Sequence, residues 1–140
     1  MSVLARSSAA ELEAALAPFQ PLPDAQWLRQ PETGLVMVRA RMGGAGAQFN
    51  FGEAPVTRCA MRLPSGAIGM AWVLGRDTRH AEYAARIDAM LQEPSAHQAL
   101  REQVITPIAR RQHEARELAS RKAAATTVSF YTLARGEDQP

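Results

Sequence analysis

The sequence predicts an α+β fold in a single domain: an antiparallel sheet of about four to five strands packed with about three to four helices, with an N-terminal helical arm. Three observations lead to this prediction. Side chains alternate with the period of two that is typical of strands along residues 34–42, 56–63 and 68–74. Helix-capping patterns and apolar residues at helical spacing follow from residue 77 onward. A chain of 140 residues is long enough for one domain with its own hydrophobic core.

Residues 1–25 are predicted to form a helix and a proline arm. Ser8 and Glu11 have the spacing of a capping box, in which each residue can satisfy a backbone N–H of the other. The helix should therefore start after Ser8 and reach about Ala17. It cannot continue through the following prolines, which are Pro18, Pro21 and Pro23.

Residues 26–75 form the predicted strand block. A short first strand around Trp27 should end at Pro31, and a second should open at Gly34. Residues 56–63 form the third strand, and the turn Pro64-Ser65-Gly66 reverses the chain into the fourth. Alternation in the third strand separates two sets of side chains, Arg58 and Arg62 on one face and Thr57, Cys59, Met61 and Leu63 on the other.

The fourth predicted strand has one bulky and one shallow face. The bulky side chains are Ile68, Met70, Trp72 and Leu74. Gly69 and Ala71 leave the opposite face shallow enough for the close approach of a helix or of another chain.

Residues 77–125 form the predicted helical block. The first helix spans Thr78 to Gln92, with Asp77 or Thr78 as N-cap, and Pro94 should end it. Its predicted apolar stripe consists of Tyr83, Ile87, Met90 and Leu91. Ser95-Ala96-His97-Gln98 has the pattern of a second capping box, and Thr106-Pro107 that of an N-cap followed by proline. Two further helices are therefore expected to meet near Thr106, the second reaching about Ala125.

The C-terminal segment is predicted to return to the sheet. Residues 127–134 alternate and are rich in β-branched and aromatic side chains, which favours a further strand. Residues 136–140 are expected to form a disordered tail.

No complete catalytic or metal-binding set is apparent in the sequence. The only cysteine, Cys59, lies on the apolar face of a predicted strand, so it is expected to be an inert packing residue. One cysteine can neither form an internal disulfide nor ligate an iron-sulfur cluster by itself. His80, His97 and His113 lie on separate helical segments without metal-ligand spacing, and His80 is expected on a helix surface. We therefore expect no cofactor and no metal bound by this chain.

Arginines of the strand block are the strongest candidates for binding. Fifteen of the 16 basic residues are arginine, although an Ala- and Arg-rich sequence is also typical of a GC-rich genome. Arg39, Arg41, Arg76 and Arg79 are candidates for phosphate contact or subunit docking. If the second and third strands pair, Arg39 and Arg41 could converge with Arg58 and Arg62. The alternative is that these arginines form the ordinary solvated side of a half-buried sheet.

The glycine-rich segment Gly43-Gly44-Ala45-Gly46 is predicted to be a turn or a partner-docking loop. A nucleotide-binding loop is disfavoured, because no Lys-Ser/Thr pair follows and the glycines do not open a helix. Residues 48–52 are expected to form an irregular or aromatic-anchored loop.

The expected location is the cytoplasm. No uninterrupted apolar run is long enough to span a bilayer, and residues 1–6 lack the basic start and the long apolar region of a signal peptide.

Three segments carry a resemblance to a known family. They are Glu32-Thr33-Gly34-Leu35-Val36-Met37-Val38-Arg39-Ala40-Arg41-Met42-Gly43-Gly44, then Trp72-Val73-Leu74-Gly75-Arg76-Asp77, and Ser129-Phe130-Tyr131-Thr132-Leu133-Ala134-Arg135-Gly136. Together with the order of the elements, they make the chain similar to the PhnG family, the G subunits of the bacterial carbon-phosphorus lyase system.

The resemblance implies a role in phosphonate catabolism. Family members work with H and I subunits and an ATPase-like L subunit to make ribose 1-alkylphosphonate 5-triphosphate from ATP and an alkylphosphonate. ATP with Mg²⁺ is then a substrate of the complex. G, H, I and J subunits form a core complex in which the J subunit is the radical component. The resemblance implies no catalytic residue in this chain.

Two other hypotheses remain open on the sequence alone. A basic binding module would recognise nucleic acid or another acidic macromolecule through its arginines. Nucleic acid is disfavoured because aromatic residues make up only 6% of the chain and no stacking platform stands out. A self-sufficient small enzyme is disfavoured by the missing catalytic set.

Overall fold

A computed structural model describes residues 1–42 and 45–126. Its elements confirm the predicted α+β class, with three strands in the described part of the chain instead of four to five. In chain order they are η1 (Leu4–Arg6), α1 (Ala9–Leu16), η2 (Ala17–Phe19), β1 (Gln26–Arg41), β2 (Gln48–Arg62), β3 (Ile68–Leu74), α2 (Thr78–Met90), α3 (Pro94–Leu100), η3 (Arg101–Ile105) and α4 (Thr106–Ala125).

The first two predicted strands are one strand, β1. Pro31 does not end it, because β1 lies at an edge of the sheet and the register to β2 shifts between Arg29 and Glu32. A bulge of this kind accommodates a proline that cannot donate to the ladder. The prediction of a strand end at Pro31 was therefore wrong.

Strand β2 begins at Gln48, well before the predicted start at Val56. Residues 48–52 pair with the end of β1, so the predicted irregular loop was wrong. Phe49 and Phe51 favour this extended conformation, and their rings contact edge to face with centroids 6.4 Å apart. Pro55 is tolerated because β3 ends opposite Val56, so Pro55 lies where β2 is itself an edge strand.

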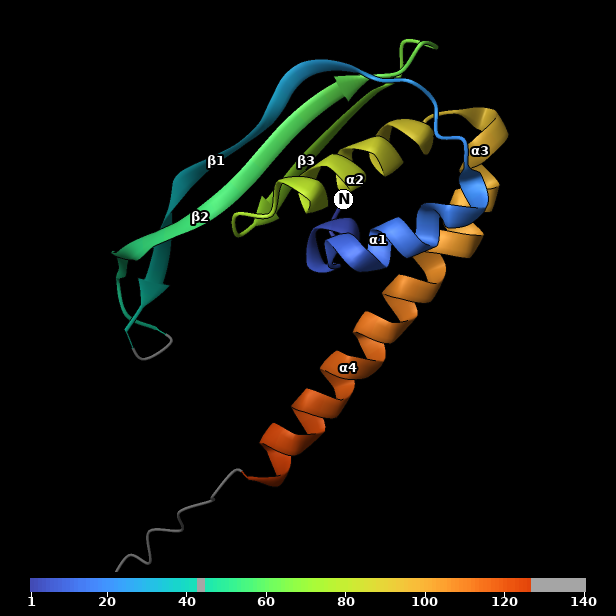
Figure 1. Ribbon diagram of the computed structural model, residues 1–140. Coiled ribbons are helices and arrows are strands. Elements are labelled where there is room, and N and C mark those ends of the chain that lie inside the picture. Colours follow the sequence, from blue (N-terminus) through green and yellow to red (C-terminus); the bar gives the residue numbers. More distant parts are fainter. Residues whose placement is uncertain (43–44, 127–140) are drawn as a thin grey trace, which may run out of the picture.

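The three strands form an antiparallel meander in the order β1-β2-β3, and the helices lie on one side of it (Figure 1). Helix α2 packs against β3 as closely as the predicted shallow face allows. A Cβ atom added at Gly69 would overlap the carbonyl oxygen of Ala85 and lie 2.6 Å from the backbone nitrogen of Ala89. Gly69 therefore permits this packing.

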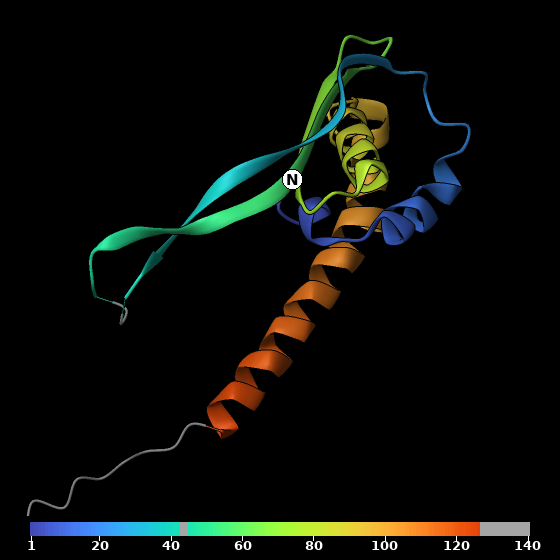
Figure 2. The same cartoon turned by 60° about the vertical axis from the view of Figure 1, so that its left-hand side comes forward.

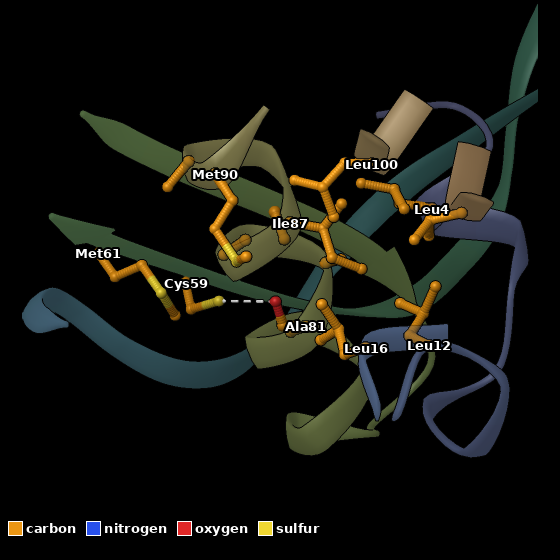
Figure 3. Close-up of a cluster of buried hydrophobic side chains, with 14 of the residues drawn as sticks. Leu4, Leu12, Leu16, Cys59, Met61, Ala81, Ile87, Met90 and Leu100 are labelled. Carbon is orange, nitrogen blue, oxygen red and sulfur yellow. Dashed lines mark hydrogen bonds between the residues drawn. The ribbon is translucent and has the colours of Figure 1, made fainter. Parts of the chain in front are cut away.

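The hydrophobic core lies between the sheet and the helices (Figure 3). Fully buried side chains from η1, α1 and α2 meet there, among them Leu4, Leu12 and Ile87. The predicted buried face of the third strand is confirmed, because Thr57, Cys59, Met61 and Leu63 are all buried. Cys59 Sγ donates to the carbonyl oxygen of Ala81 at 3.1 Å.

Helix caps place α1 and α2 as predicted. The Ser8 hydroxyl accepts from the backbone of Glu11 at 3.2 Å, and the Asp77 carboxylate accepts from the backbone of His80 at 2.9 Å. The buried face of α2 differs from the predicted stripe, since Tyr83 and Leu91 are only half-buried. Small residues take their place: Ala81, Ala84, Ala85 and Ala89. Small side chains let the helix approach Gly69 of the sheet.

The rest of the helical block is one continuous run. Helix α3 starts at Pro94 with Glu93 as N-cap, so the predicted capping box at Ser95 was wrong. A π-helical turn, η3, joins α3 to α4, and Thr106 is not a helix start. The wider π turn accommodates Pro107, whose ring and missing N–H disturb an ordinary helix interior. The run ends at Ala125, as predicted.

Three predicted features lie wholly or partly outside the described residues: the turn or docking loop at Gly43-Gly44-Ala45-Gly46, the strand at 127–134 and the tail at 136–140. Within the described part, no helix combines the length and the hydropathy needed to cross a membrane.

Candidate functional site

The three histidines of the chain are all engaged in structural contacts. His80 is buried, not on the surface as predicted, and its Nε2 lies 2.8 Å from the carbonyl oxygen of Leu4. His97 Nδ1 contacts the carbonyl oxygen of Leu91 at 2.6 Å, and His113 pairs with Glu117 at 3.2 Å. No cluster of three His, Cys, Asp or Glu residues suited to a metal occurs within 1–42 and 45–126.

Cys59 is buried as predicted. Burial raises the pKa of the Cys59 thiol to about 11, and the nearby Glu82 carboxylate acts in the same direction. A thiol with this pKa remains protonated at neutral pH and is a poor nucleophile. The interpretation of Cys59 as a packing residue agrees with this environment.

The four candidate arginines lie in two separate places. Arg39 and Arg41 are at the turn end of the β1–β2 hairpin, where an Arg41 guanidinium nitrogen donates to the carbonyl oxygen of Gly46 at 3.1 Å. Arg76 follows β3, which ends at Leu74. Leu74 lies opposite Val56 of β2, and Val56 lies opposite Gly34 of β1. Arg39 lies five residues beyond Gly34, about 17 Å along the strand. One small ligand therefore cannot bridge the two pairs in this conformation.

Arg79 has partners on two neighbouring helices. Its guanidinium pairs with Glu13 of α1 at 2.8 Å and donates to the Tyr83 hydroxyl at 3.1 Å. It also lies over the Tyr83 ring, 5.7 Å from the centroid. The hydrogen bond to Tyr83 and the charge of Glu13 raise the pKa of Arg79. These contacts connect α1 to α2.

The predicted convergence of Arg39 and Arg41 with Arg58 and Arg62 was wrong. In the strand register Arg62 lies opposite Gln26, at the far end of β1 from Arg39, and Arg58 lies opposite Glu32, near the middle of β1. Strand β1 is longer than predicted, and the two sets of arginines occupy distant parts of it.

The side of the sheet opposite α2 carries a large exposed apolar surface. We call it the outer face, and its residues are Arg29, Glu32, Gly34 and Val36 of β1, Val56, Arg58, Ala60 and Arg62 of β2, and Ile68, Met70, Trp72 and Leu74 of β3. Met70 is 55% exposed, Trp72 54% and Leu74 73%. A contiguous exposed patch of large apolar side chains is typical of a protein–protein interaction site.

An ion-pair cluster lies in the middle of the outer face. The Arg58 guanidinium lies 5.2 Å from the centroid of the Trp72 ring and pairs with Glu32 at 2.8 Å. Glu32 also pairs with Arg29 at 2.5 Å. Hydrogen bonds from Arg29 and Arg58 lower the pKa of the Glu32 carboxyl, so it remains charged at neutral pH. The cluster holds Arg58 against the exposed indole.

A shallow hollow adjoins this cluster. It is lined by Gly34, Leu35, Val36, Val56, Arg58 and Trp72. A Cβ atom at Gly34 would have no neighbour within 4 Å, so the missing side chain helps to form the hollow. The hollow is open to solvent beside Trp72.

The β1–β2 hairpin extends beyond the helices. We call residues 35–41 and 48–55 the hairpin arm, and both of its faces are bare: Leu35 and Met37 are exposed, as are Val36 and Val38. The arm projects clear of the helical layer (Figure 2). Strand β1, with 16 residues, is about 50 Å long, whereas a compact chain of this size is about 37 Å across. An arm with apolar side chains on both faces suggests contact with other chains.

Helix α4 also projects from the body (Figure 1). Ile108 is its one buried residue, and the exposed turns carry the i,i+4 pairs Arg110–Glu114 and His113–Glu117. A mostly polar helix with such pairs is typical of a solvated or bridging element. The helix is a second surface available to a partner.

Sequence reasoning identified the bulky face of β3 but not its role. The alternation of side chains did not indicate that the described elements leave this face uncovered. The sequence did contain one indication of which side would be exposed. Gly69 and Ala71 alternate with bulky residues such as Trp72 along β3, and a helix can approach closely only on the side of the small residues. The opposite, bulky side is exposed in the described structure.

The sequence matches a family model described as phosphonate metabolism protein PhnG over residues 1–136. It is also 41% identical, over 138 residues, to a protein of Rhizobium meliloti (strain 1021). That protein is named alpha-D-ribose 1-methylphosphonate 5-triphosphate synthase subunit PhnG. The alignment covers 99% of this chain and 88% of the relative.

Proposed function

Because the chain belongs to the PhnG family of phosphonate metabolism proteins, we propose that it is a non-radical subunit of the carbon-phosphorus lyase core complex. In this role it supports the synthesis of α-D-ribose 1-alkylphosphonate 5-triphosphate from ATP and an alkylphosphonate. A phosphonate oxygen replaces adenine at the anomeric carbon of ATP in this reaction. The proposed partners are the H, I and J subunits of the core complex, with the L subunit acting alongside them in the cytoplasm.

One observation carries the proposal beyond the family name. The chain presents an exposed apolar outer face and a two-sided hairpin arm, which a protein working alone would rarely leave in water. The described residues assemble no acid, base and nucleophile in one place. Both features support a subunit that completes an assembly while other chains perform the chemistry.

The candidate arginines then have two possible tasks in the assembly. Arg39 and Arg41 near the turn of the arm, and Arg76 after β3, are exposed and suited to an acidic partner surface or to phosphate oxygens of a shared substrate. Arg79 already contacts Glu13 and Tyr83, so its first task is to hold two helices together.

Reconstitution with and without this chain tests the proposal. H, I and J homologues from the same genome are co-expressed with the tagged chain, and the mass and composition of the eluate are measured. Adenine release from ATP and methylphosphonate is then followed after the L subunit is added. We expect a stoichiometric complex that releases adenine, no release by the isolated chain, and at least a tenfold loss when the chain is omitted.

The opposite pattern would contradict the role. If the other subunits assemble and release adenine at the full rate without this chain, and the chain elutes alone, it is not a functional part of the synthase.

A further inference from the structure

We propose that the outer face of the sheet is the docking surface for another subunit of the synthase, through a contact segment that is apolar with carboxylates beside it. The hollow beside Gly34 and Trp72 receives an apolar side chain of that segment. The inference rests on the proposed function, and it names the surface and the chemistry of the partner that this function requires.

Apolar contact comes from the row of β3 side chains. Ile68, Met70, Trp72 and Leu74 all point away from α2, and each is exposed along the length of the strand. A bare row of this length is unusual on a protein that acts alone. Covering it removes a methionine, a tryptophan and two aliphatic side chains from water together.

The indole of Trp72 is held ready for binding. Arg58 lies over the ring, and Glu32 fixes Arg58 by accepting from its Nε at 2.8 Å. Exposed ion pairs of this kind contribute little to folding. Tryptophan and arginine are, however, the residue types most enriched among the side chains that dominate binding at interfaces. The cluster therefore suits recognition better than stability.

The outer face also contains a depression that can receive a side chain of the partner. Gly34 lies in the row between Glu32 and Val36, and its missing side chain leaves the hollow open next to Trp72 and Arg58. Its walls combine apolar surface from Leu35, Val36 and Val56 with the polar surface that Arg58 contributes. An aliphatic or aromatic side chain of a partner fits such a depression.

Charge identifies the kind of partner. The outer face carries Arg29, Arg58 and Arg62 against Glu32 alone, a formal net charge of +2 among its charged residues. A second copy of this chain, docked by the same face about a two-fold axis, would oppose like charges. A different chain with carboxylates beside its apolar contact would satisfy the arginines that remain.

Two variants test the docking surface by opposite means. Trp72→Ala removes the anchor, whereas Gly34→Leu fills the hollow from a position where an added Cβ atom meets nothing within 4 Å. The matched control is Ala14→Leu, which adds the same side chain to an exposed position of α1 behind the sheet. Each variant is co-expressed with the H, I and J homologues, and recovery in the complex is measured against thermal unfolding of the isolated chain.

We expect Trp72→Ala and Gly34→Leu each to lower recovery in the complex at least tenfold, while both isolated chains unfold cooperatively as the unchanged protein does. Ala14→Leu should assemble normally. Arg58→Glu should also reduce assembly, because it would place a carboxylate against the partner's carboxylates.

Other outcomes separate the inference from the function on which it rests. Normal recovery of both variants in an assembly that forms with the unchanged chain would overturn the docking surface and leave the subunit role intact. Failure of the unchanged chain to assemble would overturn the function itself. If the isolated chain is a dimer and the two variants make it monomeric, the occupant is a second copy and the inference is wrong.

Discussion

Replacing Gly69 with alanine should lower the free energy of unfolding by about 3 kcal/mol, the upper range for overpacking of a core. The added Cβ atom would overlap the carbonyl oxygen of Ala85 and lie 2.8 Å from the Ala89 side chain, so the backbone of α2 would have to move away from β3. Helix α2 covers the sheet through small side chains, which offer no flexible end that could yield. Gly69→Val should leave little folded protein, because native stability is only about 5–15 kcal/mol in total.

The glycines of the hairpin provide the matched control for this change. A Cβ atom at Gly34 or Gly52 meets nothing within 4 Å, and neither residue has a positive φ. Gly52→Ala should therefore change stability by less than about 1 kcal/mol, with a gain as the expected direction. Melting followed by circular dichroism compares the two, and we expect the Tm to fall by about 10 °C for Gly69→Ala only. Equal melting temperatures would show that α2 does not pack against Gly69 in solution.

Truncating Ile87 should have a comparably large effect. Ile87 is the one fully buried large side chain in the middle of α2, among alanines that cannot expand to fill its place. Ile87→Ala should cost about 2–5 kcal/mol, because it removes buried apolar contact and leaves a cavity. The loss is measured by denaturant unfolding of the isolated chain.

Ile68→Ala is the control with identical chemistry. Ile68 lies on the outer face and is 37% exposed, so its truncation should cost less than about 1 kcal/mol in the isolated chain. A large loss at Ile68, or a small one at Ile87, would contradict the assignment of α2 to the core side of the sheet and of Ile68 to the exposed side.

Local patterns were sufficient for much of the fold. Ser8 and Asp77 cap their helices as predicted, because a short polar side chain before an amphipathic segment satisfies helix N–H groups whatever surrounds it. The alternation around Cys59 assigned its buried face correctly, and the small residues Gly69 and Ala71 indicated which side of β3 a helix could approach.

Predictions failed where distant structure overrides a local signal. Pro31 reads as a strand end, yet an edge strand with a register shift accepts it. Thr106-Pro107 reads as a helix start, yet a π-helical turn carries the helix through it. His80 looked like a surface residue because its partner, the carbonyl oxygen of Leu4, is 76 residues away in sequence.

The candidate interface was the least predictable part. Candidate arginines could be named from composition, but their separation depends on the length and register of β1, which no local pattern gave. Trp72 and Arg58 meet only because β2 and β3 pair in the observed register. Residues that bind a partner from an exposed sheet face carry the same alternation as residues that pack a core, so the sequence does not distinguish them.

The central claim is that this chain works as a subunit whose outer face and hairpin arm are covered by other chains. Amide hydrogen exchange of the isolated chain and of the assembled synthase tests it most directly. The account predicts that residues 35–41, 48–55 and 68–74 exchange at least tenfold more slowly in the assembly, while α1, which lies behind the sheet, is unchanged. An assembly in which these strands exchange as fast as in the isolated chain would contradict it.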